Sequence, residues 1–232
     1  MNSNNLVSVV MSTYNNEDSI ATAISSLVNQ SYKNIEILIM DDASTDNTYN
    51  ICKKFEKISP IVKIFRNQDN LGLTKSLNIL IKEAKGKYIA RADADDFSYT
   101  NRIEEQINFI LKKNLDACCT RAFRLDTRSK IPGYTYYVPL KILIKYKNPF
   151  IHGTLMIKKE VLQSLNLYDE KFKYAQDYKL FSDLIKNNFK ILNMKMPLYE
   201  LNTKNNISTI YKAQQKYFAD CVKKEINPEK YL

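Results

Sequence analysis

The chain has 232 residues, of which 44% are hydrophobic and 4 are glycine, and its formal net charge is +10. This composition excludes disordered, collagen-like and low-complexity classes, and the length suits one large α/β domain rather than two full domains. The longest apolar runs, such as IEILIM and LKILIKYK, are far shorter than the roughly 20 residues that span a bilayer.

Other global features bear on location and partners. The N-terminal MNSNNLVSVV lacks the basic region of a secretory signal, so we expect a cytoplasmic protein. The four cysteines do not show metal-type C-x-x-C spacing and are expected to be reduced and mostly buried. The basic excess favours nucleic acid, acidic lipid headgroups or phosphorylated small molecules as partners, but a solvated lysine-rich surface explains it equally well.

Strand and helix patterns alternate through the first half of the chain. Apolar, β-branched runs predict strands over residues 6–11, 35–42, 62–67, 87–93 and 117–123. Apolar residues at helical spacing predict a helix after each of the first four strands, with Ser44 as N-cap of the second helix and Gly86 as C-cap of the third. Strands that alternate with helices of this length imply parallel pairing in a Rossmann-like α/β sheet.

The second half is less regular. Residues 124–139 carry turn residues and predict a long loop or hairpin over the sheet edge. A strand in IHGTLMIKK, a short helix in EVLQSLN and a longer helix in DYKLFSDLIKNN are expected to follow. We therefore expect two halves of one domain, residues 1–123 and 124–208, and a basic amphipathic C-terminal helix at 209–232.

Asp93, Asp95 and Asp96 crowd together directly after the fourth predicted strand. Three close carboxylates raise one another's pKa values unless a cation lies between them, and oxygen-only ligands suit Mg²⁺ or Mn²⁺. The same residues also precede a predicted helix, whose N-terminus favours negative charge. The spacing alone leaves a metal site and a helix cap equally open.

Polar clusters follow three of the predicted strands and are expected to gather at one edge, where ligands of such sheets bind. Asp42 has the chemistry to accept a uracil imide N–H or a ribose hydroxyl, and Tyr14 offers a face on which a base stacks. Helix capping and ordinary packing explain each residue separately. Neither G-x-G-x-x-G nor G-x-x-x-x-G-K-[ST] occurs, which disfavours a dinucleotide or P-loop site.

Three motifs in order carry a resemblance to a known family: VSVVMSTYNNEDSIATAISSLVNQSYKNIEILIMDDASTDNT, NLGLTKSLN and KGKYIARADADD. Together they resemble the nucleotide-sugar domain of family 2 glycosyltransferases, over roughly residues 6–200. The resemblance implies a GT-A fold, a single domain with a mixed, mainly parallel sheet flanked by helices. It also implies inverting transfer of a sugar from a nucleoside diphosphate sugar, with Mn²⁺ or Mg²⁺ as cofactor.

The resemblance assigns the donor side residue by residue. It makes Ser12, Thr13 and Tyr14 the first nucleotide-contacting loop and Asp42 the acid that reads the base, with Glu17 at a frequent acidic position nearby. Asp93 and Asp95 match the D-x-D motif, with Asp93 near ribose and metal and Asp95 as direct metal ligand; Asp96 is a further candidate ligand. Lys75 and Arg91 fall in family-like contexts and either face the phosphates or are surface cations.

On the acceptor side, the segment YDEKFKYAQDYKLF makes Asp177 the general base, which a single displacement requires, although capping of a helix N-terminus also explains it. Gln176 stands where the family often has Glu, and the lost like charge predicts a weaker base. His152 is assigned either to the acceptor side or to a structural role. The family's Arg and His before Ile-Ser are missing from PLYELNTKNNIS, which leaves Lys204 as a candidate replacement.

The resemblance favours transfer from a UDP-sugar to a glycan or lipid-linked glycan acceptor in polysaccharide, lipopolysaccharide or capsule synthesis. A sugar nucleotidyltransferase is the second enzyme class considered, but STYNNED is not its glycine- and arginine-rich loop. A catalytically degenerate nucleotide-sugar binder is the third; no nucleic-acid partner is expected. The C-terminal helix, with Ile210, Ala213, Tyr217 and Val222 on its apolar side, either contacts the inner face of an anionic membrane or packs on its own domain.

Overall fold

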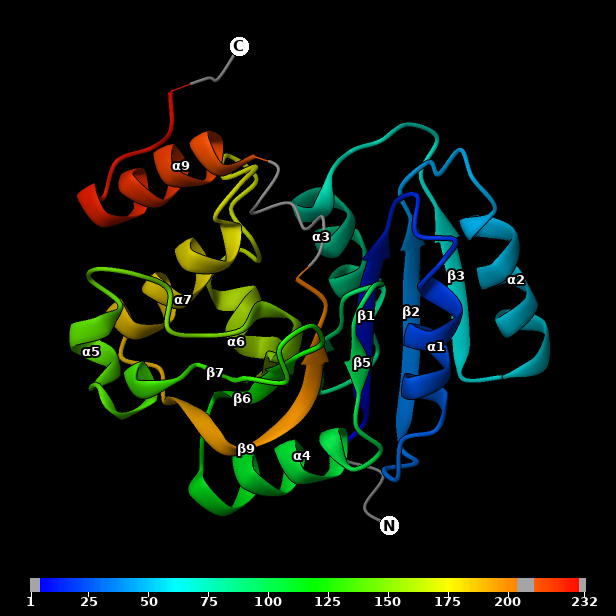
Figure 1. Ribbon diagram of the computed structural model, residues 1–232, viewed down its shortest axis with the longest axis horizontal. Helices are drawn as coiled ribbons and strands as arrows, with labels where there is room; N and C mark the ends of the chain where they lie inside the picture. The colour runs from blue at the N-terminus through cyan, green and yellow to red at the C-terminus, as the bar shows by residue number, and fades with distance from the viewer. Residues whose placement is uncertain (1–4, 204–210, 230–232) are drawn as a thin grey trace.

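The computed structural model describes residues 5–203 and 211–229, and Figure 1 shows its elements around one curved sheet. In chain order these elements are β1 (Val7–Thr13), α1 (Ile20–Val28), β2 (Ile35–Asp41), α2 (Thr48–Ile58), β3 (Val62–Arg66), α3 (Leu73–Glu83), β4 (Tyr88–Arg91), β5 (Phe97–Ser98), α4 (Arg102–Lys113), β6 (Ala117–Arg124), β7 (Lys130–Ile131), η1 (Tyr134–Tyr137), α5 (Leu140–Leu143), η2 (His152–Thr154), β8 (Met156–Lys158), α6 (Lys159–Ser164), α7 (Gln176–Lys186), β9 (Ile191–Leu201) and α9 (Lys212–Lys224).

The N-terminal half is the predicted series of parallel strands joined by helices. The order is β3-β2-β1-β4, with Val9 of β1 paired to Ile37 of β2 on one side and to Ala90 of β4 on the other. β1 and β2 are buried at nearly every position because helices cover both faces of the sheet. The carboxyl ends of β1, β2 and β4 therefore meet at one edge, as expected.

The C-terminal half makes the sheet mixed. β8 lies between β4 and β6 and runs antiparallel to both. β9 then pairs in parallel with β6 and antiparallel with the short β5, which completes the order β3-β2-β1-β4-β8-β6-β9-β5. The expected mixed, mainly parallel sheet is confirmed, but the predicted fifth strand, β6, joins β4 only through β8.

Hydrophobic clusters cover the two faces of the sheet. On one face, α1, α2 and α4 bury side chains such as Leu27, Cys52 and Ile107. On the other, α3, α6, α7 and α9 bury side chains such as Leu80 and Phe181. All four cysteines are free and buried. Among the described residues, no helix has the length and hydropathy needed to cross a membrane.

Two predicted helix caps were wrong. The second helix begins at Thr48 after Asn47, and Ser44 lies in the preceding loop, where its hydroxyl accepts a hydrogen bond from the backbone of Asn15. The third helix ends at Glu83, before Gly86. A Cβ at Gly86 would lie 2.6 Å from the backbone nitrogen of Ser8, so glycine is required there for close approach to β1.

The C-terminal helix α9 packs on its own domain. Phe218, Cys221 and Val222 are buried against the core, and the ring of Phe218 lies 6.1 Å from that of Phe172. Tyr217 is partly buried beside them. Ile210, predicted on the same face, lies outside the described residues. Ala213, also predicted on this side, is exposed, so protein covers the apolar side of the helix only from Tyr217 onward.

Candidate active site

The loops that follow β1 and β2 are joined into one surface by hydrogen bonds. The backbone N–H of Asn47 donates to Oε2 of Glu17 (2.8 Å), and that of Glu17 donates to Oδ2 of Asp46 (3.1 Å). The side chain of Asn15 accepts a further bond from the backbone of Thr45 (2.9 Å). The Glu17 carboxylate, predicted near the nucleotide, thus connects the two loops.

The first predicted nucleotide loop continues directly from β1. Ser12 and Thr13 are the last residues of the strand, and the Thr13 hydroxyl donates to Oδ1 of Asn16 (3.1 Å). Tyr14, the next residue, is 46% exposed, so one face of its ring is available for stacking.

The carboxylate of Asp42, just beyond β2, is buried and already holds three donors. Its Oδ1 accepts from the side chain of Asn67 (2.7 Å) and from the backbone of Leu71 (2.9 Å), and its Oδ2 accepts from the backbone of Gly72 (2.8 Å). A carboxylate has about four acceptor positions, so this arrangement leaves roughly one for a ligand. The residues that Asp42 binds, Leu71 and Gly72, directly precede α3. Lys75 is exposed on the first turn of this helix.

The acidic turn after β4 carries the three aspartates in different surroundings. The backbone of Asp93 donates to the hydroxyl of Tyr199 (2.9 Å), and its carboxylate pairs with Arg91. Asp96 is buried, and its Oδ1 accepts from the backbone of Asn202 (2.7 Å). Burial and the charge of Asp93 raise the pKa of Asp95 to about 6.

This turn fits a divalent cation held by two carboxylates. Among residues 5–203 and 211–229, no three His, Cys, Asp or Glu side chains converge as a metal cluster. The raised pKa of Asp95 reflects burial first and then repulsion from Asp93, which a cation between them would relieve. Mg²⁺ and Mn²⁺ typically take one or two protein carboxylates and complete their shell with phosphate oxygens and water. Asp95 and Asp93 suit this role, and Asp96 stays a further candidate, because only its Oδ1 is bonded to Asn202 while its buried Oδ2 has no hydrogen-bond partner among the described residues.

Arg91, predicted to face the phosphates or the solvent, is instead buried beneath the acidic turn. Its side chain is 2% exposed and forms an ion pair with Asp93. Burial lowers the pKa of Arg91, but the charge and hydrogen bond of Asp93 outweigh it and the pKa is raised. The charge of the same guanidinium also acts to lower the pKa values of Asp177 and His152.

Asp177 opens α7, after Ala175 in the left-handed conformation at φ 51°. Its Oδ2 accepts from the side chain of Asn148 (2.7 Å) and its Oδ1 from its neighbour's backbone, that of Tyr178 (2.8 Å). Burial raises the pKa of Asp177, and these two bonds and the Arg91 charge offset it only in part. The adjacent Gln176 is buried. The prediction of a weaker base considered only the loss of a negative charge at position 176. Burial of Asp177 acts in the opposite direction, because it raises the pKa of this carboxyl.

His152 bonds to a tyrosine near the same cation. Its Nε2 lies 2.7 Å from the hydroxyl of Tyr168. Burial, and then the charge of Arg91, lower its pKa well below the usual value of 6.5. The lowered pKa favours the neutral imidazole, which suits either the acceptor-side or the structural role predicted for His152.

Two residues of this site were missed from the sequence, Arg102 and Tyr199. The fully buried guanidinium of Arg102 donates to the carbonyl oxygens of Arg91 (3.0 Å) and Gly153 (2.8 Å), and it lies 5.1 Å from the ring centroid of Tyr199. The signal that could have revealed Arg102 is its position beside Ile103 on the apolar face of α4. A charged side chain at a core position of a helix is rarely buried without a hydrogen-bonding or charged partner.

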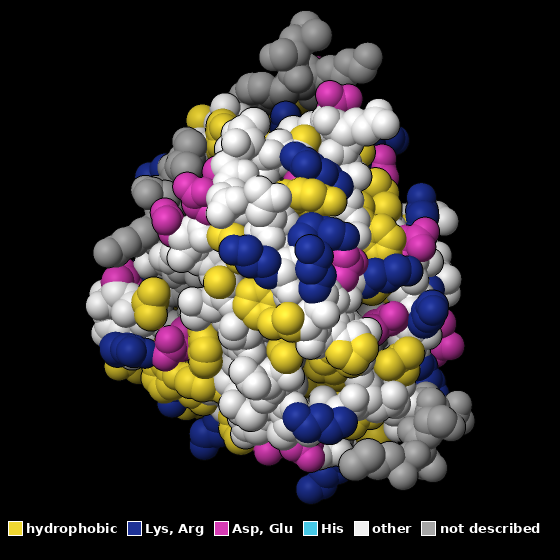
Figure 2. Space-filling view, turned by 90° about the vertical axis from the view of Figure 1, so that its right-hand side faces the viewer, with side chains coloured by type: hydrophobic (Ala, Val, Ile, Leu, Met, Phe, Trp, Pro, Cys, Tyr) yellow, Lys and Arg dark blue, Asp and Glu magenta, His cyan; other side chains and the backbone are white. Residues whose placement is uncertain are grey.

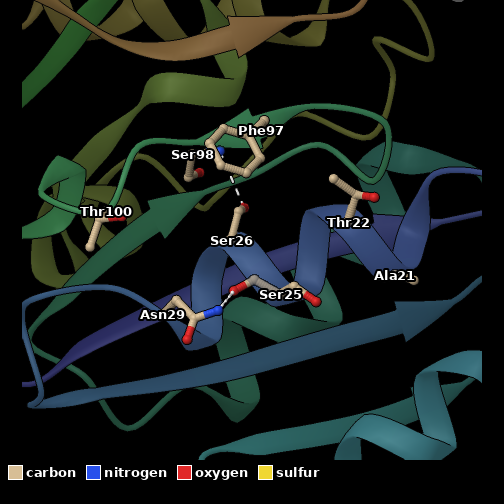
Figure 3. Close-up of a pocket in the computed structure, with 8 residues that line it drawn as sticks. All are labelled: Ala21, Thr22, Ser25, Ser26, Asn29, Phe97, Ser98 and Thr100. Atoms are coloured by element: carbon tan, nitrogen blue, oxygen red, sulfur yellow. Dashed lines mark hydrogen bonds between the residues drawn. The ribbon is translucent and has the colours of Figure 1, made fainter.

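A shallow pocket of about 380 Å³ lies elsewhere, between α1 and the β5 turn. Figure 3 shows its polar lining, in which Ser26 accepts from the backbone of Ser98 (3.2 Å) and Asn29 bonds to Ser25 (2.9 Å). None of its lining residues is charged, so it offers no acid, base or metal ligand.

Comparison with known proteins gives the family. Residues 8–165 match the sequence profile described as Glycosyl transferase family 2. The chain belongs to this family. It is 33% identical over 206 residues to a protein named putative glycosyltransferase EpsE of Bacillus subtilis, covering 87% of this chain and 74% of EpsE. It is 32% identical over 185 residues to the Escherichia coli UDP-Glc:alpha-D-GlcNAc-diphosphoundecaprenol beta-1,3-glucosyltransferase WfgD, covering 79% and 71%.

Solved glycosyltransferase structures share the fold. TarS of S. aureus, crystallised with UDP, superposes with a TM-score of 0.76 at 22% identity, covering 97% of this chain and 67% of TarS. Mannosyltransferase PcManGT of Pyrobaculum calidifontis, in complex with GDP-Man and Mn²⁺, superposes with the same TM-score at 16% identity, covering 97% and 65%. The family 2 glycosyltransferase described here therefore has the GT-A fold, as the resemblance predicted.

Neutralising Asp95 is expected to stabilise this glycosyltransferase when no ligand is bound. Because the folded-state pKa of about 6 lies above the ordinary 3.8, the free energy of unfolding falls as pH rises between these values. Asp95→Asn removes that loss, so at pH 8 it should add about 2 kcal/mol, or a Tm about 5 °C higher. The gain should vanish below about pH 4. A lower Tm for the variant at pH 8 would refute the repulsion.

Proposed function

We propose that this protein transfers a hexosyl or N-acetylhexosaminyl residue, with inversion, from a UDP-sugar to a glycan or lipid-linked glycan acceptor. The reaction takes place at the cytoplasmic side of the cell membrane and serves polysaccharide, lipopolysaccharide or capsule synthesis. Asp177 is the general base, and Asp95 and Asp93 hold Mn²⁺ or Mg²⁺.

The observation that carries the proposal is the buried Arg91. Its guanidinium pairs with Asp93 of the acidic turn and also lowers the pKa of Asp177 from the opposite half of the domain. One cation therefore couples a carboxylate on the donor side to one on the acceptor side. Asp177 keeps a raised pKa despite this cation, which suits a base that must take a proton near neutral pH.

The chemistry follows from these positions. An acceptor hydroxyl oxygen bonds to the anomeric carbon while the bond from that carbon to the diphosphate oxygen breaks. The hydroxyl proton passes to Asp177, and the electron pair leaves with the nucleoside diphosphate. A bound divalent cation supplies charge neutralisation for that diphosphate. Asn148 and the backbone of Tyr178 orient the Asp177 carboxylate for the transfer.

The donor and acceptor classes rest on relatives. TarS was crystallised with UDP, and the name of WfgD gives UDP-glucose as donor and a diphosphoundecaprenol-linked sugar as acceptor. In this chain, Tyr14 offers the exposed ring for the base, and Ser12, Thr13 and the remaining acceptor position of Asp42 lie beside it. Lys75, exposed on the first turn of α3, supplies a cation for the phosphates. Lys204 lies outside the described residues.

Donor hydrolysis tests the reaction without knowledge of the acceptor. With water in place of the acceptor, UDP-glucose, UDP-galactose and UDP-N-acetylglucosamine are incubated with protein and Mn²⁺. Because these donors are α-linked, an inverting enzyme should release UDP and, by NMR before mutarotation, the β-anomer of at least one sugar. Release of the α-anomer would contradict inversion. Tight UDP binding without any release would instead support the nucleotide-sugar binder.

A further inference from the structure

We propose that the protein lies on anionic phospholipid through a surface next to Asp177, formed by Tyr134, Tyr137, Lys141, Lys145, Tyr146 and Lys147, which we term the Tyr/Lys surface. The predicted membrane contact was the C-terminal helix α9. The Tyr/Lys surface differs from α9 in its exposed aromatic side chains, its charge and its connection to the base.

The tyrosine side chains of this surface are exposed to solvent. Tyr134, Tyr137 and Tyr146 are 94%, 72% and 70% exposed, and Ile142 between them is 53% exposed. Large apolar side chains in one such group mark interaction sites, and tyrosine is enriched at the headgroup level of membranes. In α9 the corresponding large side chain, Phe218, is 4% exposed. The helix therefore has its apolar face turned to protein, while the Tyr/Lys surface has its own turned outward.

Contacts on its inner side attach the surface to the domain. Tyr136 packs its ring 5.1 Å from the guanidinium carbon of Arg121, and the Arg121 side chain donates to the carbonyl oxygen of Pro132 (2.8 Å). Leu143 and Ile144 of the adjoining turn are buried. These anchors leave Tyr134, Tyr137 and the lysines facing away from the core, as an interfacial surface requires.

Charge selects an anionic partner. Residues 127–150 contain five Lys and Arg and no Asp or Glu, whereas residues 212–229 of the α9 segment contain four Lys and three Asp and Glu. One α9 lysine, Lys223, pairs with Asp220 (2.9 Å), and in residues 127–150 Arg128, which is not part of the Tyr/Lys surface, pairs with Glu200. On the face that carries α2 and β3, Figure 2 shows Lys and Arg interspersed with Asp and Glu. The uniform positive sign of residues 127–150 is complementary to an acidic lipid leaflet.

The Tyr/Lys surface is connected directly to the base. The carbonyl oxygen of Ile144 accepts from the hydroxyl of Tyr178 (2.6 Å), and Asn148, just after Lys147, donates to Asp177 (2.7 Å). Figure 1 shows α5 at the edge of the molecule opposite α2. A bilayer at this edge would bring a lipid-linked acceptor to Asp177, and this last step rests on the proposed function.

Vesicle co-sedimentation of the full-length protein tests the inference. The wild type should bind vesicles of phosphatidylcholine with phosphatidylglycerol, weaken as salt rises, and bind poorly to phosphatidylcholine alone. Each lysine near an anionic leaflet contributes about fivefold in partitioning, so Lys141→Gln, Lys145→Gln and Lys147→Gln together should reduce it on the order of 100-fold. Replacing Tyr134, Tyr137 and Tyr146 by Ser should also reduce it, because their rings no longer insert.

The matched control carries Lys212→Gln, Lys216→Gln and Lys224→Gln in α9 and should change partitioning less than about twofold, because the α9 lysines are interspersed with Asp220, Glu225 and Glu229 and the large apolar side chain of this helix, Phe218, is buried. Loss of binding in this control alone, unchanged binding in both surface variants, or no vesicle binding by the wild type would overturn the inference.

A tyrosine variant that dissociates a dimer without affecting vesicle binding would also overturn it, because the partner of the Tyr/Lys surface would then be a second copy of this chain. UDP affinity, measured in parallel, should stay unchanged in every variant, so its absence throughout would count against the proposed function alone.

Discussion

Asp177→Asn is expected to lower kcat for sugar transfer by about 10²- to 10⁴-fold while UDP binding stays within about twofold. Asn keeps the size of the side chain and one acceptor oxygen, but it cannot take the proton of the acceptor hydroxyl. In the wild type, burial raises the pKa of this carboxyl above the ordinary Asp value of 3.8. The acidic limb of the kcat/KM profile should therefore lie above that value, with activity rising as pH increases and the carboxyl ionises.

The control for this prediction is Asp183→Asn, two turns along α7. Asp183 pairs with Lys179 (2.6 Å) on the same helix and makes no contact with the acidic turn in the described structure. Its replacement should change kcat by less than about twofold. A variant Asp177→Asn that keeps more than about a tenth of the wild-type rate would assign the base to another residue.

Arg102→Met is expected to lower the free energy of unfolding by about 3 kcal/mol, or the Tm by about 9 °C. The guanidinium of Arg102 satisfies the buried carbonyl oxygens of Arg91 and Gly153, and methionine fills similar space but donates no hydrogen bond. Burial lowers the pKa of Arg102, so removing the charge returns part of the loss. Thermal or urea unfolding measures the difference.

The same substitution should also reduce transfer. Arg91, whose carbonyl Arg102 holds, carries the ion pair to Asp93, and Tyr199, against which Arg102 packs, accepts from the backbone of Asp93. Arg124→Met, at an exposed position of β6, makes the same chemical change outside the network and should alter stability by less than about 0.5 kcal/mol. Equal stability for both variants would mean that the buried guanidinium contributes nothing net.

Sequence patterns predicted the N-terminal half of the fold because its signals are local. Buried strands such as β2 are continuous apolar runs, and the intervening helices show apolar residues at helical spacing. β9 was not predicted. It contains Pro197, and its pairing with β6 has register shifts on both sides of Arg121, so neither composition nor alternation marks it as a strand. Gly86 was assigned to a helix cap because contact with Ser8 depends on tertiary structure.

For the candidate site, too, local motifs predicted some residues, whereas others depend on tertiary contacts. Asp93, Asp95 and Asp177 were predicted from motifs; Asp93 forms an ion pair with the buried Arg91, whose charge also lowers the pKa values of Asp95 and Asp177 against the effect of burial. The interactions that hold them join residues far apart in sequence: Tyr199 contacts Asp93 across 106 positions. Burial also shifts the pKa values of Arg91 and Asp177, and burial follows from packing that a motif does not contain.

The most direct test of the account is calorimetric binding of UDP to the wild type and to Asp95→Ala, each with and without Mn²⁺. UDP should bind the wild type tightly only with Mn²⁺, and this binding should be lost in the variant, because Asp95 is proposed to hold the cation that neutralises the diphosphate. GDP and dTDP, as controls, should bind more weakly than UDP. Absence of binding by any nucleotide, or UDP binding unaffected by both Mn²⁺ and the substitution, would contradict a metal-nucleotide site at the acidic turn.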